Sequence, residues 1–352
     1  MNEEEHLNAD KGEKQKPEDY REESESLIEQ FLQETGAALG EAEVEDDWHE
    51  EVLPEDHRSG FVALIGRPNV GKSTLINAFV GQKVAIVSSK PQATRTRVLG
   101  ILTTAEFQVI FIDTPGIHQK PPHKLNQKMI DQAVTSIPDA DVILFVVDIS
   151  GPPHEEDKII ARLLKEKAAK RPIIFVLNKM DKLGLEEAEA RIDSYWKLLP
   201  GYTDSIPTSA LEGTNVELLR DHILGHLPEG PRYYPGDQIT DQTPYQIAAE
   251  LVREALLENT YQEIPHATAI LIEDYQERED GTTYIGARIW VERESQKPII
   301  IGKGGQKLKK IGTTARQELE RFVGGKVFLD LWVKVKPKWR DQEARLRELG
   351  YD

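Results

Sequence analysis

The chain has 352 residues, enough for two domains, and contains no cysteine, which excludes disulfide bonds and cysteine-based metal sites. Its formal charge of −17 arises within residues 1–57, which hold 21 acidic and 4 basic residues, so the remainder carries 40 of each sign. No apolar run approaches the roughly 20 residues of a membrane span, and the acidic N-terminus is unlike a secretory signal. These features predict a cytoplasmic protein.

Residues 1–57 predict a disordered acidic extension, because like charges dominate and too little apolar surface is present to offset chain entropy. Within it, residues 26–32 have apolar side chains at helical spacing. That island is interpreted either as a partner-binding helix or as a transient helix without a role.

Residues 58–230 alternate apolar strands with amphipathic helices, a pattern typical of a doubly wound α/β domain with a mostly parallel sheet. Two of the strands are separated by three residues only, too few for a crossover helix, so they predict an antiparallel hairpin in a mixed sheet. The expected strands are 61–65, 98–103, 107–112, 142–148, 172–177 and 205–208, and the expected helices are 72–80, 124–136, 155–169, 185–199 and 214–226.

Residues 231–243 are rich in turn formers and predict a linker. Residues 244–340 then predict a small α+β domain, and residues 341–352 a C-terminal helix. The elements expected in the α+β domain are a helix at 244–259, strands at 264–274 and 283–293, a short apolar segment, a helix at 305–322 and a strand at 326–336. Glu250, Arg253 and Glu254 are interpreted as a solvated helix face with local ion pairs, and His266 as structural.

A phosphate-binding motif follows the first strand of the α/β domain. The run GRPNVGKS at 66–73 matches G-x-x-x-x-G-K-[ST] between a strand and a helix. Glycines allow backbone N–H groups to surround phosphate oxygens, and Lys72 adds a charge for the outer phosphates. Ser73 is expected to be a Mg²⁺ ligand.

Two further motifs complete a guanine nucleotide site. Asn178-Lys179-Met180-Asp181 predicts guanine selection, since the Asp181 carboxylate can accept from both N–H donors of guanine, a pair that adenine lacks. Asp113-Thr114-Pro115-Gly116 is expected to hold Mg²⁺ through water and to sense the γ-phosphate, with Thr94 as the remaining metal ligand. Lys72, Thr94 and Gly116 are the predicted catalytic residues. The predicted GTP-binding residues are Gly66, Arg67, Pro68, Asn69, Val70, Gly71, Lys72, Ser73, Thr74, Asp113, Thr114, Pro115, Gly116, Asn178, Lys179, Asp181, Ser209, Ala210 and Leu211.

A second functional motif lies in the α+β domain. A G-x-x-G loop precedes a helix in a stretch, 288–340, that holds 14 basic and 5 acidic residues. Such a loop can clamp the backbone of about four nucleotides. In the last strand Trp332 shares a face with Lys334 and Lys336, and either stacks on a base or is half-covered by neighbours. The predicted RNA-binding residues are Gly302, Lys303, Gly304, Gly305, Lys307 and Lys310.

Taken together, GRPNVGKST, PQATRTR, DTPGI, NKMD and SAL resemble the motifs of the Era family of GTPases from about Phe61 to the C-terminus. The resemblance implies a G domain followed by a type II KH domain, and a switch that binds the 3′ region of 16S rRNA in small-subunit assembly. It also implies GTP and GDP as ligands, with peripheral association at the inner face of the cell membrane as a further expectation; no DNA binding is expected. The chain departs from the family at Ala93, where a second threonine is common.

Ile117 occupies the place where many GTPases carry a water-orienting glutamine, so slow intrinsic hydrolysis is expected. In similar GTPases an asparagine at the position of Asn69 helps to bind K⁺, which makes K⁺ a candidate for the missing positive charge. Alternatively, Asn69 only shapes the turn. The competing functional hypothesis is a nucleotide-gated RNA-binding module in which hydrolysis is incidental.

Overall fold

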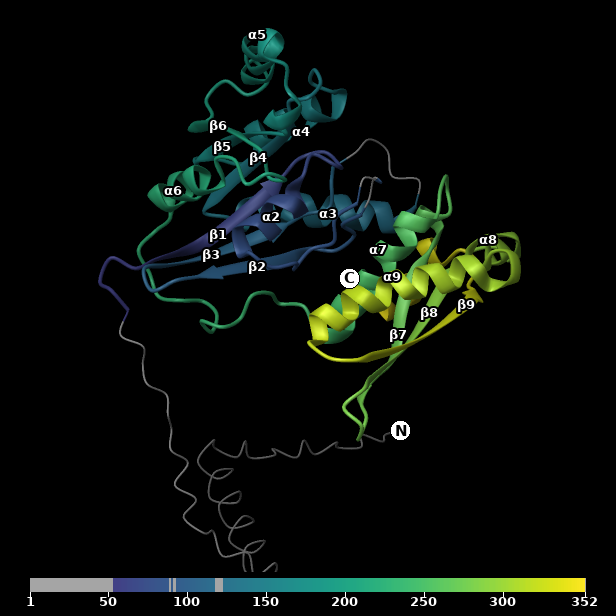
Figure 1. The fold of residues 1–352 in the computed structure, drawn as a ribbon. Helices are drawn as coiled ribbons and strands as arrows, with labels where there is room; N and C mark the ends of the chain where they lie inside the picture. The colour runs from purple at the N-terminus through teal and green to yellow at the C-terminus, as the bar shows by residue number, and fades with distance from the viewer. Residues whose placement is uncertain (1–52, 89, 91–92, 118–122, 352) are drawn as a thin grey trace, which may run out of the picture. The chain divides into compact units, whose positions relative to one another are not determined.

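The computed structural model describes residues 53–88, 90, 93–117 and 123–351 (Figure 1). The chain divides into two units, Met1–Val52 and Leu53–Asp352, of which the second is compact. The first unit, and with it the predicted helix at 26–32 and most of the acidic extension, lies outside the described residues.

A six-stranded sheet with the order β2-β3-β1-β4-β5-β6 forms the first domain of the larger unit. The β2–β3 pair is antiparallel and the other pairs are parallel, which confirms the predicted mixed sheet. All seven residues of β4, VILFVVD, are buried, as expected for a parallel strand that is covered on both faces. The strands are β1 (Arg58–Ile65), β2 (Val98–Thr103), β3 (Phe107–Asp113), β4 (Val142–Asp148), β5 (Ile173–Asn178) and β6 (Asp204–Thr208).

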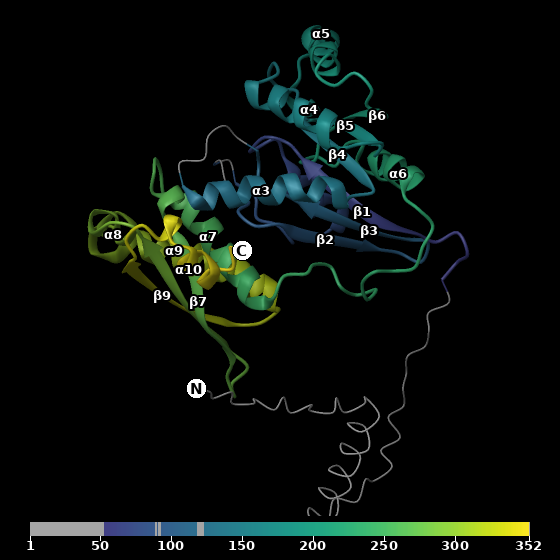
Figure 2. The same ribbon diagram turned by 180° about the vertical axis from the view of Figure 1, so that it is seen from behind.

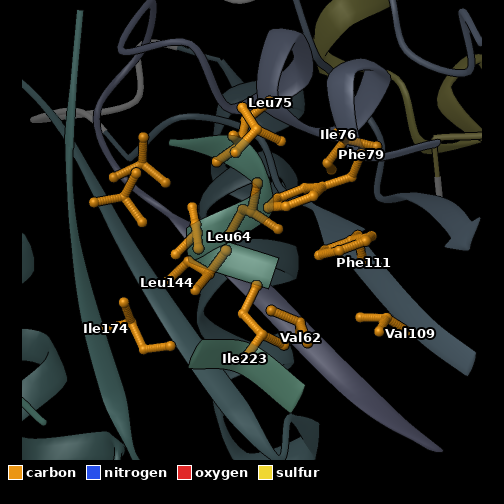
Figure 3. Close-up of a cluster of buried hydrophobic side chains, with 14 of the residues drawn as sticks. Val62, Leu64, Leu75, Ile76, Phe79, Val109, Phe111, Leu144, Ile174 and Ile223 are labelled. Carbon is orange, nitrogen blue, oxygen red and sulfur yellow. The ribbon is translucent and has the colours of Figure 1, made fainter. Parts of the chain in front are cut away.

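Helices cover both faces of this sheet. On one face, α2 (Lys72–Val80) and α6 (Val216–His226) pack over an apolar cluster in which Phe79 stacks on Phe111 at 4.4 Å (Figure 3). The other face is covered by α3 (Lys124–Asp139), α4 (Glu155–Lys167) and α5 (Leu185–Trp196). The carboxyl ends of β1, β3, β4 and β5 therefore meet at one edge, where open α/β sheets bind ligands.

The second domain has a three-stranded sheet of order β7-β8-β9, with β8 antiparallel to β7 and parallel to β9. Three helices pack on one face of it, and α9 lies in front of the strands in Figure 1. The elements follow the predicted order, and the stretch expected as a short apolar segment forms a short helix. The elements are α7 (Pro244–Asn259), β7 (Ala269–Glu277), β8 (Thr283–Val291), α8 (Lys297–Ile301), α9 (Gln306–Val323) and β9 (Val327–Val335).

The other face of the small sheet is only partly covered. Trp290 is buried against Trp339 and Leu346, the latter in α10 (Glu343–Glu348), which is labelled in Figure 2. Along β9, Phe328 and Trp332 remain 53% and 56% exposed. This sheet face is therefore divided into a buried half and an open aromatic half.

The connection between the domains, residues 231–243, forms no helix or strand but binds the first domain closely. The N–H of Ile101, in β2, donates to the carbonyl of Ile239 at 2.9 Å, and Gly100 forms an isolated bridge with Thr240. Because β2 is the end strand of its sheet, the linker occupies an edge that would otherwise be open.

Two predictions for the second domain are wrong in part. Arg253 and Glu254 are not solvated: they are 1% and 6% exposed, because this face of α7 contacts Lys83, Val87 and Ala93 of the first domain. The predicted local ion pair does form, between Arg253 and Glu250. His266 lies in a 3-10 turn ahead of β7 rather than in a strand.

Candidate functional site

The phosphate-binding loop lies between β1 and α2, as predicted. Asn69 and Gly71 have φ angles of 63° and 102°, so the chain takes the left-handed conformation twice and directs backbone groups inward. A Cβ on Gly71 would lie 2.3 Å from Nδ2 of Asn178, and one on Gly66 would lie 2.4 Å from the carbonyl oxygen of Val146. Both glycines are therefore required by close packing.

The Lys72 side chain folds back over the phosphate-binding loop. Its Nζ donates to the carbonyl oxygens of Gly66 at 3.1 Å and Arg67 at 3.2 Å. Burial lowers the pKa of Lys72 to about 8, an effect that the nearby Asp113 carboxylate opposes. A phosphate at this position would favour the charged ammonium, so nucleotide binding and protonation of Lys72 are linked.

Three oxygens predicted to bind Mg²⁺ come together beside Lys72. Ser73 Oγ donates to Asp113 Oδ2 at 2.7 Å and lies 3.0 Å from Thr94 Oγ1, which donates to the same carboxylate oxygen at 3.3 Å. Asp113 is fully buried, its Oδ1 has no hydrogen-bond partner, and burial raises its pKa. An acceptor in this position fits a metal-bound water, so the residues present suit Mg²⁺.

The guanine motif is braced against the phosphate-binding loop. Asn178, which is 2% exposed, donates from Nδ2 to the carbonyl of Val70 at 2.7 Å and accepts at Oδ1 from the N–H of Ala210 at 3.0 Å. Ser209 Oγ donates to Asp181 Oδ1 at 2.7 Å. This hydrogen bond orients the Asp181 carboxylate, an arrangement suited to a base with two donors.

An ion network that sequence reasoning missed lies beneath these motifs. Lys179 Nζ donates to the carbonyl of Asn69 at 2.7 Å and to Asp148 Oδ2 at 2.6 Å, while Arg67 pairs with Asp148 at 3.7 Å and with the fully buried Asp157 at 3.4 Å. Although burial disfavours its charge, the Lys179 ammonium holds the pKa of Asp148 low. In the sequence, the position of Asp148 at the end of a buried strand could have indicated that this carboxylate belongs to the site.

Together these elements border a cleft of about 440 Å³. The unpredicted apolar residues Ile86 and Val87 also line it, whereas Thr114 is buried and donates from Oγ1 to the carbonyl of Leu64. Ile117 is 6% exposed and packs in the apolar cluster beneath the sheet, so it cannot orient a water. The predicted site residues that line the cleft are Pro68, Asn69, Gly71, Lys72, Ser73, Thr74, Thr94, Gly116, Lys179 and Leu211.

The G-x-x-G loop joins α8 to α9. Gly302, Gly304 and Gly305 have φ angles of 74°, 58° and 79°, and a Cβ on Gly302 would lie 2.7 Å from the Cβ of Lys307. Lys303 and Lys310 are exposed, and the loop ends at the N-terminus of α9, where backbone N–H groups favour an anion. The loop thus combines close backbone approach with positive charge.

A groove continues from this loop between α9 and β9. It consists of two adjoining cavities of about 390 and 360 Å³ that share Leu308 and Leu331. Its floor is apolar and its rim is basic, and Trp332 lies at one end. The residues around the floor are Lys297, Ile301, Gly305, Lys309, Gly312, Thr313, Arg316, Leu329, Asp330 and Val333. Of these, only Gly305 was predicted as an RNA-binding residue.

The loop that carries Thr94 is attached to the second domain by three cations, of which Arg95 and Arg253 are buried. Arg95, 3% exposed, donates to the carbonyls of Thr268 at 2.6 Å and Pro265 at 3.0 Å. Lys90 donates to carbonyls at the C-terminus of α7, and Arg253 donates to the carbonyl of Ala93. A residue beside the expected metal ligand thus binds the domain that carries the groove.

Comparison with known proteins gives matches to both domains. The family model described as a 50S ribosome-binding GTPase matches residues 61–179, and a KH domain model matches residues 263–340. The chain is 48% identical over 298 residues to GTPase Era of Heliobacterium modesticaldum, covering 85% of this chain and 98% of that protein. It is also 48% identical to GTPase Era of Leuconostoc citreum, over 84% of this chain and 97% of the relative.

Two solved structures are similar over both domains. Era in complex with MgGDPNP and nucleotides 1506–1542 of 16S ribosomal RNA is 42% identical, with a TM-score of 0.79 over 84% of this chain and 99% of that one. Aquifex aeolicus Era Y63A bound to GDP·AlF4⁻ gives the same values. Within residues 53–351, apart from the gaps, no helix is long and apolar enough to cross a membrane.

Proposed function

Since this chain belongs to the Era family of GTPases, we propose that its guanine nucleotide site controls how its KH domain binds the 3′ region of 16S rRNA during small-subunit assembly. The observation that carries the proposal is the contact of Arg95 with residues 265–268, because it joins the loop of the nucleotide site to the RNA-binding domain. The family model that matches residues 61–179 is described by binding to the 50S ribosome. We propose 16S rRNA instead, because a solved relative that is similar over both domains is bound to it.

In this function the chain's own residues bind and orient the nucleotide. Lys72 and the backbone N–H groups of the phosphate-binding loop neutralise the phosphates, and Asp181 selects guanine. Ser73, Thr94 and, through water, Asp113 would hold Mg²⁺, which supplies positive charge at the phosphates. The relative crystallised with MgGDPNP supports this assignment.

The water that attacks the γ-phosphate lacks a glutamine to orient it, because the position is taken by buried Ile117. K⁺ bound near Asn69 is our proposal for the missing charge, motivated by the left-handed turn at Asn69 beside the phosphate loop. Comparing hydrolysis in KCl with that in NaCl tests it: equal rates, together with a harmless Asn69→Ala substitution, would refute a role for K⁺.

Coupling follows from the order of residues in one short loop. Thr94 Oγ1 lies 3.0 Å from Ser73 Oγ, where it would bind Mg²⁺ when GTP is present, and the adjacent Arg95 is bonded to the second domain. Release of Thr94 after hydrolysis would then weaken the hold of Arg95 on residues 265–268. In this way a change at the γ-phosphate reaches the KH domain.

Crosslinking of bound RNA with GTP analogue and with GDP, followed by sequencing, tests the proposal directly. We expect reads at the 3′ end of 16S rRNA that depend on the nucleotide. Single-turnover hydrolysis with and without that RNA addresses the alternative of incidental hydrolysis, which an unchanged rate would favour. Peripheral membrane association remains a proposal from family resemblance, and protein left entirely in the supernatant after sedimentation with anionic vesicles would refute it.

A further inference from the structure

The open half of the KH sheet carries an aromatic and arginine surface that the nucleotide site and the G-x-x-G loop do not use. Phe328 and Trp332 alternate with core residues along β9 and are 53% and 56% exposed. Tyr284, which pairs with Phe328 across the β8–β9 ladder, stacks beside it with ring centroids 5.9 Å apart. Large exposed apolar side chains grouped in this way indicate a binding surface.

Arginines lie over these rings. The Arg278 guanidinium is 4.7 Å from the Tyr284 ring centroid and 5.4 Å from that of Phe328, and Arg288 is 5.6 Å from Trp332. Trp332 is also held by its indole N–H, which donates to Asp330 Oδ2 at 2.8 Å. Aromatic rings and guanidinium planes on an open sheet face are the groups on which single-stranded RNA stacks its bases.

Trp332 connects this surface with the groove beside the G-x-x-G loop. It lines the groove cavity together with Lys297 and Ile301, yet its strand position places it on the outer face with Phe328. Because β9 is the edge strand, only that strand separates the groove from the outer face. Phe328 lies four residues from Trp332, about 13 Å along the strand.

We propose that RNA leaving the KH groove passes over β9 at Trp332 and stacks on a second site formed by Phe328, Tyr284 and Arg278. The inference rests on the proposed function, since it extends the path of the same RNA. A KH groove holds about four nucleotides, so a longer single strand must leave it, and continuity at Trp332 favours RNA over a protein as the occupant.

The test measures how Phe328 substitutions affect the binding of RNAs of two lengths to the full chain. One oligonucleotide from the 3′ end of 16S rRNA has about four nucleotides and a second is about three times as long. Phe328→Ala is expected to weaken binding of the long RNA about tenfold, the order of one lost stacking contact, and to leave the short one unchanged. Phe328→Leu should behave like alanine and Phe328→Trp like the unsubstituted chain.

Trp196→Ala, at an exposed tryptophan of α5, is the matched control and should change neither affinity. Ultraviolet crosslinking should place the long RNA, and not the short one, on residues 278–284 or 328. Long-RNA affinity that survives Phe328→Ala but is lost in Gly304→Asp would overturn the second site and leave the proposed function intact. Affinity that survives both substitutions would overturn the proposed function as well.

Discussion

Replacing Arg95 by alanine tests the connection between the nucleotide site and the KH domain most directly. The Arg95 guanidinium is 3% exposed and makes bonds of 2.6 and 3.0 Å to the carbonyls of Thr268 and Pro265. Bonds from a charged donor are each worth about 1.5–3 kcal/mol. The substitution also removes the cost of desolvating the guanidinium, so we take the lower value for each bond. The interaction free energy between the loop of the nucleotide site and the KH domain should therefore fall by about 3 kcal/mol.

The assay compares RNA affinity in the presence of GDP and of a non-hydrolysable GTP analogue. Allosteric couplings are typically worth about 1–3 kcal/mol, so a loss of this size should bring the two affinities close together. Arg97→Ala is the matched control, since Arg97 has the same charge, lies two residues away and is exposed. The ratio of the two affinities should survive in that variant.

An Arg95→Ala protein that retains the full difference between the two nucleotides would refute the reasoning. Hydrogen exchange at the backbone N–H groups of residues 266–268 adds an independent measurement, because the carbonyls of this segment would lose the Arg95 guanidinium that holds them. Faster exchange there in the alanine variant, without a change in the G domain core, is the expected pattern.

Four other predictions concern the G domain. Burial holds the pKa of Lys72 at about 8, so nucleotide binding above that pH should take up a proton and weaken as the pH rises. Calorimetry at pH about 8.5 in two buffers of different ionisation enthalpy measures this proton uptake, and equal binding heats in the two buffers would contradict it. Gly116→Ala would place a Cβ 2.5 Å from the backbone nitrogen of Pro68, and the displaced phosphate loop should lower GTP affinity about tenfold in a filter-binding assay, while an unchanged affinity would show that the loop yields freely. Asp181→Asn should reduce GTP affinity and favour a xanthine nucleotide, whose ring presents an acceptor to the new amide; unchanged preference in a competition assay would remove Asp181 from base selection. Phe111→Ala should lower the free energy of unfolding by about 3–5 kcal/mol in a denaturant titration, since Phe111 is fully buried against Phe79, and a loss below about 1 kcal/mol would argue against that packing.

The sequence was sufficient for elements whose physical signal is local. The buried strands of the large sheet read as continuous apolar runs, and the three-residue connection between β2 and β3 required a hairpin. The glycines of both loops indicated close backbone approach to a ligand, and the structure has Gly71 and Gly304 in the left-handed conformation. Motif and spacing predicted ten of the residues that line the cleft, whereas they missed the apolar lining residues Ile86 and Val87.

What the sequence did not predict depends on contacts between distant segments. Arg253 was assigned to a solvated face because a helix with alternating charges usually is one, but its partner is the carbonyl of Ala93, 160 residues earlier. Arg67, Asp148 and Asp157 form one network although they belong to three separate elements. Periodicity along one helix carries no information about which loop will lie against it.

The linker bonded to β2 bears on how the G domain behaves when it is separated from the rest of the chain. An unpaired edge strand offers its N–H and C=O groups to any other strand, including that of a second molecule. In the intact chain Ile239 and Thr240 satisfy part of this edge. A fragment that stops before these two residues would expose unpaired N–H and C=O groups along β2. Self-association of such a truncated domain would therefore say nothing about the oligomeric state of the whole protein.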